Sequence, residues 1–395
     1  MNVLFLIVFL DLIGFGMLIP VFPFFAERIG ISPETVIFFG GLYSFGQLAG
    51  APLWGALSDR IGRRPVLLLT LAANVLASLA LAFIHTPAAL AASRIISGLA
   101  AGNISTAFAY VSDVTDDRSR PRALGMLGVA FAMGFILGPA LGGLLSTAGT
   151  DRSDIRPIAL ASAVLSGIAL LGTFVFLRES LTDELKARAV AQSRAGRRRG
   201  ELVTRPGLRE LFGATLVLLS ATSMLQVVFP LWAAARLGMG PVGVGYVYAI
   251  VATVSAVTQG GAIGPLTRRF GEANIVRASF VLAAIGFLLV IPSTTPWMTV
   301  LALVPYSIGT SVFGPSVSGM IAKRAQAQER GAALGVYQGA ASLGRVVGPF
   351  TASGIAKVAG LSGPLAIAAL ISLSGLLLIR ESRAAATAPT EPAVT

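Results

Sequence analysis

Cysteine is absent from this chain of 395 residues, and histidine occurs once, at His85. Without cysteine the chain forms no disulfide and offers no thiolate, and a lone histidine excludes an imidazole-based metal cluster within one chain. We expect no metal site, and we expect His85 to lie at a helix end. Charged residues make up 12% of the chain, about half the ~25% typical of soluble domains, which excludes an ordinary soluble fold.

Apolar residues form 55% of the chain, and the mean hydropathy is +0.80. We identify twelve apolar spans of about 20–25 residues, the length that crosses the hydrocarbon core of a bilayer. They cover residues 3–25, 35–57, 65–86, 88–112, 123–147, 157–177, 210–235, 241–266, 273–292, 296–321, 332–356 and 361–379. The sequence predicts an all-α membrane protein with twelve transmembrane helices. The first span lacks a basic leader and carries Asp11, so we interpret it as a helix rather than a cleaved signal peptide.

The net charge of +12 follows the predicted topology. One side of the predicted membrane holds 23 of the 30 lysines and arginines, the other side holds five, and Arg94 and Arg345 lie inside spans. Because positive loops mark the cytoplasmic face, both termini and the middle linker are expected in the cytoplasm, with the chain in the inner (plasma) membrane. No basic surface is left over to indicate nucleic acid, and no G-x-x-x-x-G-K-[ST] indicates an ATP-driven pump.

The two halves of the chain repeat each other. GALSDRIG at Gly55–Gly62 returns as GPLTRRFG at Gly264–Gly271, an offset of 209, and GFILGP at residues 134–139 returns as GRVVGP at 344–349. FLRES at residues 176–180 returns as LIRES at 378–382. A repeat this long indicates a duplicated half, with a pathway between the halves. We predict six-helix bundles at 1–179 and 208–383, a basic linker at 180–207 and a disordered tail at 384–395.

The linker allows two interpretations. Residues Leu181, Leu185 and Ala189 fall on one helical face, which indicates a short helix on the lipid headgroups, followed by GRRRG at residues 196–200 that would pair with anionic lipid. A solvated flexible tether fits the same composition.

The loop GALSDRIGRRPVL resembles the signature motif of the major facilitator superfamily, with every polar position filled. The resemblance implies two bundles of six helices related by a pseudo-twofold axis, and a latch that holds the cytoplasmic side shut. In the family, the matching Asp docks the first half onto the start of the eleventh helix, and the resemblance implies this role for Asp59. The matching Arg and its acid partner become Arg63 and Asp113. The expected latch comprises Gly55, Asp59, Arg60, Gly62, Arg63, Arg64 and Asp113. In the second half Arg268 and Lys323 replace Asp59 and Asp113, so that copy cannot form the same latch.

The fifth span resembles the "antiporter" motif of the drug/proton antiporter branch of this superfamily, through Gly134, Gly138, Pro139, Gly142 and Gly143. Small residues at four-residue spacing also let membrane helices pack closely, so a purely structural role is the alternative. In the eleventh span Gly344, Gly348 and Pro349 persist, whereas Ala352 and Ser353 replace the glycine pair.

Two charged residues inside spans are the candidates for proton coupling. Asp11 lies in DLIGFGMLIPVFP, which resembles the first helix of the same branch, including tetracycline-type exporters. A carboxylate in a membrane helix costs roughly 2.5–3.5 kcal/mol to insert, so it normally faces a cavity. An Asp11 that snorkels to the interface is the alternative. Arg94 resembles the arginine of the family's fourth helix, which implies a role in proton coupling or substrate charge, and a structural bond to the backbone of the first helix is the alternative. Because the predicted depths of Arg94 and Asp11 differ by about 15 Å at ~1.5 Å per residue, the sequence does not establish a direct ion pair between them.

Polar and aromatic side chains in the expected cavity-lining spans are the candidate substrate contacts: Gln47, Asn103, Gln226, Tyr246, Gln259, Tyr306, Tyr337, Gln338 and Arg345. The sequence thus favours a drug/proton antiporter that exports small amphipathic compounds by alternating access, with protons as the coupling ion and no other cofactor. We expect a monomer whose partners are substrate and membrane lipid, and no enzyme activity. A proton-coupled or facilitative metabolite carrier and a lipid flippase are the alternatives. Tetracycline exporters use further membrane acids and a histidine in their second half. In this chain the second half has no histidine and span nine has no acid, so tetracycline itself is not the expected substrate.

Overall fold

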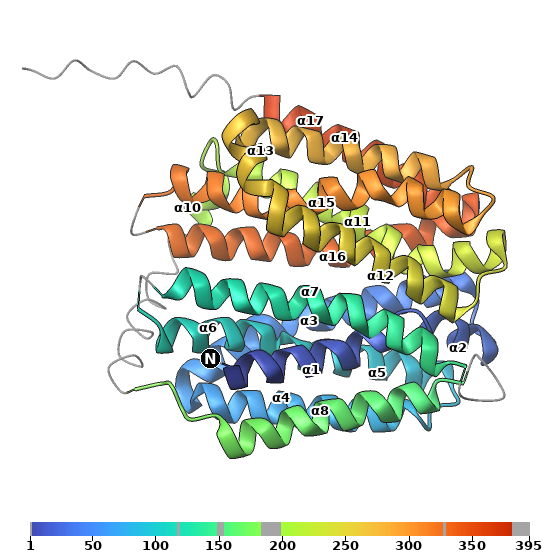
Figure 1. The fold of residues 1–395 in the computed structure, drawn as a ribbon, viewed down its shortest axis with the longest axis horizontal. Helices are drawn as coiled ribbons and strands as arrows, with labels where there is room; N and C mark the ends of the chain where they lie inside the picture. Colours follow the sequence, from blue (N-terminus) through green and yellow to red (C-terminus); the bar gives the residue numbers. More distant parts are fainter. Residues whose placement is uncertain (1, 117–118, 148–153, 183–198, 327–328, 381–395) are drawn as a thin grey trace, which may run out of the picture.

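The computed structural model describes residues 2–116, 119–147, 154–182, 199–326 and 329–380, and the described part is helical and contains no strand (Figure 1). The first half comprises α1 (Asn2–Leu18), α2 (Phe22–Arg28), α3 (Pro33–Ile61), α4 (Arg63–Leu81), α5 (Pro87–Ala100), η1 (Ala101–Asn103), α6 (Ile104–Val114), α7 (Arg120–Leu145) and α8 (Arg156–Phe176). The second half comprises α11 (Arg209–Leu237), α12 (Pro241–Val257), η3 (Thr258–Ala262), α13 (Ile263–Phe270), α14 (Glu272–Val290), α15 (Pro296–Arg324), α16 (Arg330–Ala359) and α17 (Gly363–Arg380).

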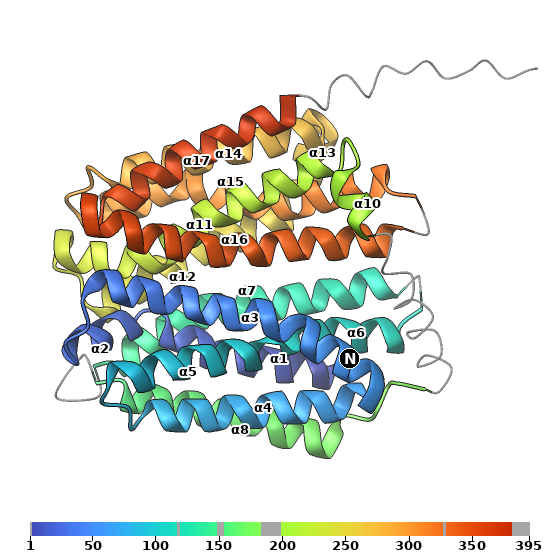
Figure 2. The ribbon, with the colours of Figure 1, turned by 180° about the vertical axis from the view of Figure 1, so that it is seen from behind.

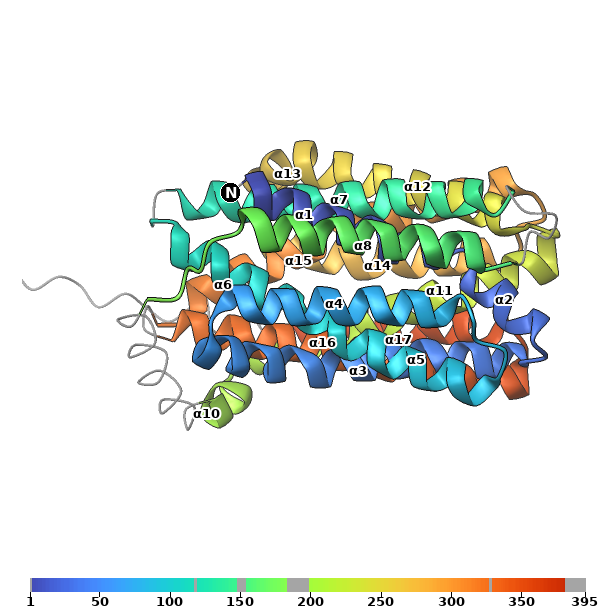
Figure 3. The same ribbon diagram turned by 90° about the horizontal axis from the view of Figure 1, so that it is seen from below.

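The halves form two bundles whose helices run side by side along one direction (Figures 1 and 2). The short helix α10 (Arg199–Thr204) packs on α11 and α16. The start of α1, the α3–α4 turn, α10, α13 and the end of α17 share one end of the molecule, called the basic end below, and α2 lies at the opposite end (Figure 3). The proposed interfacial linker helix and the tail fall outside the described residues.

The predicted spans match the helices closely. Ten helical segments of the described residues, from Val3–Arg28 to Pro296–Arg324, are long and apolar enough to cross a membrane. The shorter apolar segment Gly363–Ile379 and the 30-residue helix α16, which carries Arg345 and Lys357, complete the predicted set. The protein is a multi-pass, all-α membrane protein, and the twelve-helix interpretation agrees with this arrangement.

Three predicted spans are broken rather than continuous. The first divides at Ile19–Val21, where Pro20 and Pro23 each lack the N–H that a helix interior needs. The fourth contains the 3₁₀ turn η1, where Gly102 packs against the backbone at Gly50, and the eighth contains the π-helical turn η3 with Gly260 and Gly261. Such turns free backbone groups and often mark functional positions in membrane helices.

The bundles pack by different means. The second half is filled by large side chains that are almost wholly buried: Phe229, Trp232, Phe280, Phe287 and Phe313. The first half relies more on close backbone approach, as where Gly46 and Gly50 of α3 meet α5. Large apolar side chains such as Leu76, Phe83 and Leu171 are mostly exposed, as expected for a surface that faces lipid rather than water.

Candidate functional site

Asp11 lies inside the first bundle and is held by neutral donors from three other elements. Its Oδ1 accepts hydrogen bonds from Asn74 Nδ2 of α4 and from Ser166 Oγ of α8, both at 3.1 Å. Its Oδ2 accepts from Asn103 Nδ2, at the end of η1, at 3.5 Å. The carboxylate therefore faces α4, η1 and α8 rather than lipid, and it does not snorkel to the interface.

Arg94 of α5 is buried, with 7% of its surface exposed. Its guanidinium lies 4.6 Å above the ring of Phe22 in α2, a cation–π contact. Among the described residues its buried Nε has no hydrogen-bond partner. The aromatic ring compensates only part of the cost of burying this cation.

Tyr43 of α3, which the sequence analysis did not single out, lies among the charges of both halves. Asp11, Arg94 and Arg345 all act electrostatically on its hydroxyl, and its ring stacks on Phe15 at 5.0 Å. In the second half, Arg345 of α16 lies near Tyr337 of the same helix, and its Nη2 donates to Ser342 Oγ at 3.0 Å. We call Asp11, Tyr43, Arg94, Tyr337 and Arg345 the central cluster.

The other cavity candidates are scattered. Asn103 belongs to the Asp11 site, and Gln47 lies where α3 meets Gly98 of α5. Gln259 donates to the Ser311 carbonyl at 3.1 Å, a bond between helices. Tyr306 lies in the core of the second bundle, with its ring 5.4 Å from Phe287. Three more candidates are exposed: Gln226, Tyr246 and Gln338.

The structure brings the predicted latch residues together at the basic end. Arg63 donates from Nη1 to Asp59 at 2.5 Å and from Nε to Asp113 at 2.9 Å. Gly62, with φ of +112°, forms the tight turn between α3 and α4. Asp59 keeps 44% of its side chain exposed, and it pairs with Arg63 within the first half. Arg60 lies in the last turn of α3 and Gly55 lies further back in the same helix. Arg64 lies in the first turn of α4 and donates to the Phe174 carbonyl at 2.6 Å.

Glu179, in the repeated FLRES segment, fastens the start of the linker to this latch. Its Oε1 accepts from the backbone N–H of Arg63 at 2.9 Å, and its Oε2 accepts from that of Arg64 at 3.1 Å. It also accepts from the N–H groups of Ser180 and Leu181. An acid that satisfies the first N–H groups of α4 stabilises the helix terminus.

We predict that Glu179→Ala lowers the free energy of unfolding by about 1–2 kcal/mol, because the first turn of α4 loses its acceptor. Thermal or denaturant unfolding in detergent measures the change. Glu201→Ala on α10 is the control, since Glu201 is exposed. An unfolding transition equal to that of the control would contradict this role for Glu179.

The glycine motif of α7 packs against both halves. Gly138 meets Gly16 of α1, and Gly142 lies against the backbone of Met17. A methyl group added at Gly143 would lie 3.1 Å from the Pro241 carbonyl of α12, in the second bundle. The second-half copy repeats this pattern, because Ser353 Oγ of α16 donates to the Glu34 carbonyl of α3 at 2.8 Å.

We predict that Gly142→Ala costs about 1–3 kcal/mol of stability, because the new methyl overlaps the backbone of α1. Gly125→Ala is the matched control on the same helix, since a methyl there meets no atom within 4 Å and should change stability by less than about 0.5 kcal/mol. Thermal unfolding of both variants in detergent compares them. Equal stability of the two would show that the close approach is not needed.

The contacts between the halves concentrate at the end opposite the basic end. Besides the Gly143 and Ser353 contacts, the rings of Phe38 and Phe350 meet at 5.0 Å. Several glycines nearer the basic end have open space beside them, since an added methyl group would meet no atom within 4 Å. They are Gly125 and Gly128 of α7, Gly260 and Gly261 of η3, and Gly331, Gly335 and Gly339 of α16. The inter-bundle contacts named here therefore lie towards the end opposite the basic end.

Two similar helical bundles packed against each other are the architecture of a membrane transporter. The family model of the Major Facilitator Superfamily matches residues 4–263 and 211–393. The chain belongs to this superfamily.

Similar proteins include tetracycline resistance proteins. The class D tetracycline resistance protein of Salmonella ordonez is 31% identical over 349 residues, covering 87% of this chain and 86% of the relative. The class C protein of Escherichia coli is 29% identical over 88% of this chain and 87% of its own. The crystal structure of the human organic anion transporter MFSD10 (TETRAN) has a TM-score of 0.70 at 26% identity, over 96% of this chain and 98% of that one.

Proposed function

We propose that the protein exports small amphipathic compounds from the cytoplasm in exchange for protons. The observation that carries this proposal is the position of Asp11, a carboxyl group inside the bundle that receives hydrogen bonds from Asn74, Asn103 and Ser166. Neutral donors support the carboxylate, and hydroxyl and amide groups can also accept from the protonated acid. With no cation in this set of partners, the charge of Asp11 can respond to what enters the central cluster.

The basic end is proposed to face the cytoplasm of a cell whose inner (plasma) membrane holds the chain, by the rule that positive loops stay inside. Since the contacts between the halves concentrate at the opposite end, we propose that this structure corresponds to the inward-facing state, which would load substrate from the cytoplasm. The proton is proposed as the coupling ion, with no other cofactor, and the monomer as the working unit.

The exchange follows from electrostatics. A substrate with a positive group about 6 Å from Asp11 would stabilise its ionised form by about 3 kcal/mol at an effective dielectric constant of about 20. Substrate entry thereby expels the proton, and the loaded bundles rock until the opposite end opens. A proton entering from outside neutralises Asp11 and weakens substrate binding, so the compound leaves. Arg94 and Arg345 then suit the anionic or polar end of a zwitterionic compound.

The two arginines also favour a second function, a proton-coupled carrier of organic anions. Arg94 has no acidic partner among the described residues, and the similar MFSD10 structure is described as an organic anion transporter. An anion binds better when Asp11 is protonated, because their charges no longer repel. This arrangement moves proton and substrate in the same direction, so it predicts symport and not antiport.

Transport across a defined pH gradient distinguishes the two functions. Purified protein in liposomes would be tested with three fluorescent probes: the lipophilic cation ethidium, a zwitterionic fluoroquinolone and an anionic fluorescein derivative. Antiport predicts accumulation of ethidium or the fluoroquinolone in the acidic compartment. Symport predicts accumulation of the anion in the alkaline compartment, and that result alone would overturn the export proposal.

A lipid flippase is the remaining alternative. A groove of about 440 Å³ lies between α4 and α8, lined by Leu68, Leu69, Ala72, Leu170, Leu171 and Phe174. Its lining is apolar, so it suits acyl chains but offers nothing to hold a headgroup, and we do not propose this function.

A further inference from the structure

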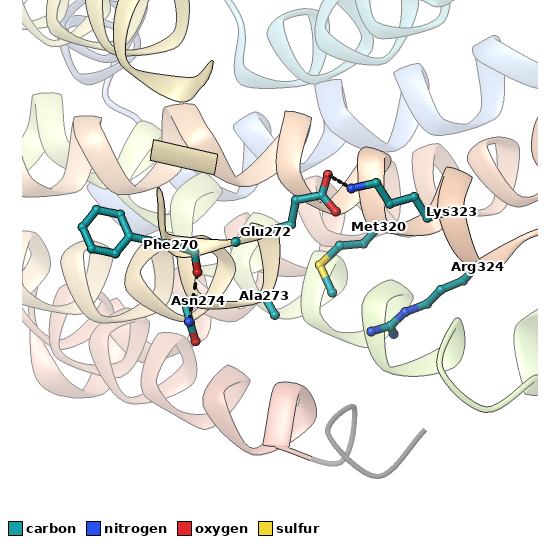
Figure 4. Close-up of a pocket in the computed structure, with 8 residues that line it drawn as sticks. Phe270, Glu272, Ala273, Asn274, Met320, Lys323 and Arg324 are labelled. Carbon is teal, nitrogen blue, oxygen red and sulfur yellow. Dashed lines mark hydrogen bonds and ion pairs between the residues drawn. The ribbon is translucent and has the colours of Figure 1, made fainter. Parts of the chain in front are cut away.

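The ion pair of the first-half latch recurs in the second half with its charges exchanged. Lys323 Nζ of α15 lies 2.9 Å from Glu272 Oε1 of α14, beside a surface pocket of about 340 Å³ (Figure 4). Glu272 corresponds to Arg63 at the offset of 209 that relates the two loops, and Lys323 corresponds to Asp113 at the offset of 210 that relates residues 134–139 to 344–349. The second copy therefore retains the position of the pair while reversing its polarity.

The same reversal applies to the exposed charge of each copy. In the first half this charge is Asp59, in the last turn of α3 before Gly62. Its counterpart is Arg268, an exposed residue in the last turn of α13 before Gly271. Gly271 adopts φ of +76° and Gly62 adopts +112°, so both copies end in a left-handed glycine turn. The two turns are thus equivalent in backbone and opposite in charge.

Helix pairing identifies what each turn meets when the basic end closes. Helix α3 packs along α16, and helix α12 packs along α7. Helix α12 continues into η3 and α13. Closure at the basic end therefore brings the end of α3 towards the start of α16, and the end of α13 towards the start of α7. Asp59 suits the α16 start, since a helix N-terminus is positive and exposed Arg330 lies there.

Arg268 needs a different partner, because the N-terminus of α7 would repel a cation. The exposed acid Asp116 stands there, where its Oδ1 accepts from the backbone N–H of Ser119 at 2.7 Å and from Ser119 Oγ at 2.5 Å. Asp116 thus has a fixed position at the start of α7 and a charge complementary to Arg268.

We propose that the basic end closes through two contacts of opposite polarity, and that the second is an ion pair between Arg268 and Asp116. The first contact, Asp59 with the start of α16, is the one that the family resemblance implies. Because the signs are exchanged, each turn is repelled by the other's partner, and the halves close in a single register. This inference concerns the outward-facing state and does not depend on the transported compound or on proton coupling.

The absence of cysteine makes paired-cysteine experiments direct. Spin labels at Ser112→Cys and Gln326→Cys, both exposed near the basic end, would report the separation of the halves in lipid vesicles. Asp116→Asn keeps an acceptor for Ser119 but loses the charge. We expect Asp116→Asn and Arg268→Asp each to reduce the short-distance population by about twofold to fivefold, the upper part of the range for an exposed ion pair. Arg268→Asp combined with Asp116→Arg should restore it.

Arg269→Asp is the matched control, since Arg269 is the exposed neighbour on the same turn and its guanidinium lies over Phe270. It should change the population by less than twofold. Oxidative crosslinking of an Asp116→Cys, Arg268→Cys protein traps even a minor closed state, and we expect the bond to form. The proposal would be overturned if the Asp116→Cys, Arg268→Cys protein did not crosslink and the spin-labelled protein, with Asp116 and Arg268 intact, showed no short distance. So would an Arg269→Asp effect equal to that of Arg268→Asp, or a double reversal without recovery.

Discussion

Asp11→Asn should remove proton-driven accumulation while leaving exchange of substrate across the membrane intact. A pH difference of one unit is worth about 1.4 kcal/mol per proton, so one-for-one exchange sustains a roughly tenfold substrate gradient. Asparagine matches the shape of aspartate and can still bond Asn74 and Ser166, but it carries no charge to titrate. The expected accumulation ratio therefore falls from about ten to about one, measured in proteoliposomes with an imposed pH gradient.

The control for this variant is counterflow, in which labelled substrate exchanges with unlabelled substrate without a pH gradient. Counterflow needs the bundles to rock but needs no net proton movement, so it should continue in the Asp11→Asn protein. Glu201→Gln, a neutralised acid on α10, should accumulate substrate normally. If Asp11→Asn still accumulated substrate tenfold, the coupling site would lie elsewhere.

Arg94→Met should stop transport and raise thermal stability. The buried Arg94 guanidinium has the ring of Phe22 as its neighbour and no acid partner among the described residues. Replacing an incompletely compensated buried charge with an apolar side chain of similar length is commonly neutral or stabilising by about 1–4 kcal/mol. Sites that bind ligands often trade stability for function in this way. Thermal unfolding in detergent and uptake in liposomes measure the two effects.

Arg94→Lys separates charge from shape. Lysine keeps the positive charge but lacks the planar guanidinium that stacks on an aromatic ring and binds an anionic group with two parallel bonds. We expect partial transport and no gain in stability. A destabilised Arg94→Met protein would indicate that Arg94 is structural, and normal transport by Arg94→Met would exclude it from the pathway.

The fold could be predicted from the sequence because its main signals are local. Apolar length marks each span, and the structure places helix ends within a few residues of most predicted ones, as for α14 (Glu272–Val290) against the span 273–292. The breaks were missed for different reasons. Pro20 and Pro23 were noted but not used to divide the first span, whereas the turns at η1 and η3 depend on packing with neighbouring helices.

Asp59 and Arg63 could be singled out because they sit at fixed spacing in one motif, whereas Asp113, 50 residues beyond Arg63, came from the family resemblance. The structure brings these three residues together. Asn74, Ser166 and Tyr43 were missed because an isolated polar residue in an apolar span does not reveal its partner. A systematic list of polar residues in the spans would have included all three. Tyr306 shows the opposite error, because only helix packing decides that its ring faces Phe287 in the core.

The most direct test of the account is the number of protons released when substrate binds to purified protein. Isothermal titration in several buffers with different heats of ionisation gives this number at each pH. Antiport predicts release of up to one proton in the wild-type protein and none in Asp11→Asn. Proton uptake on binding, or release that persists in Asp11→Asn, would contradict the claim that substrate and proton compete through Asp11.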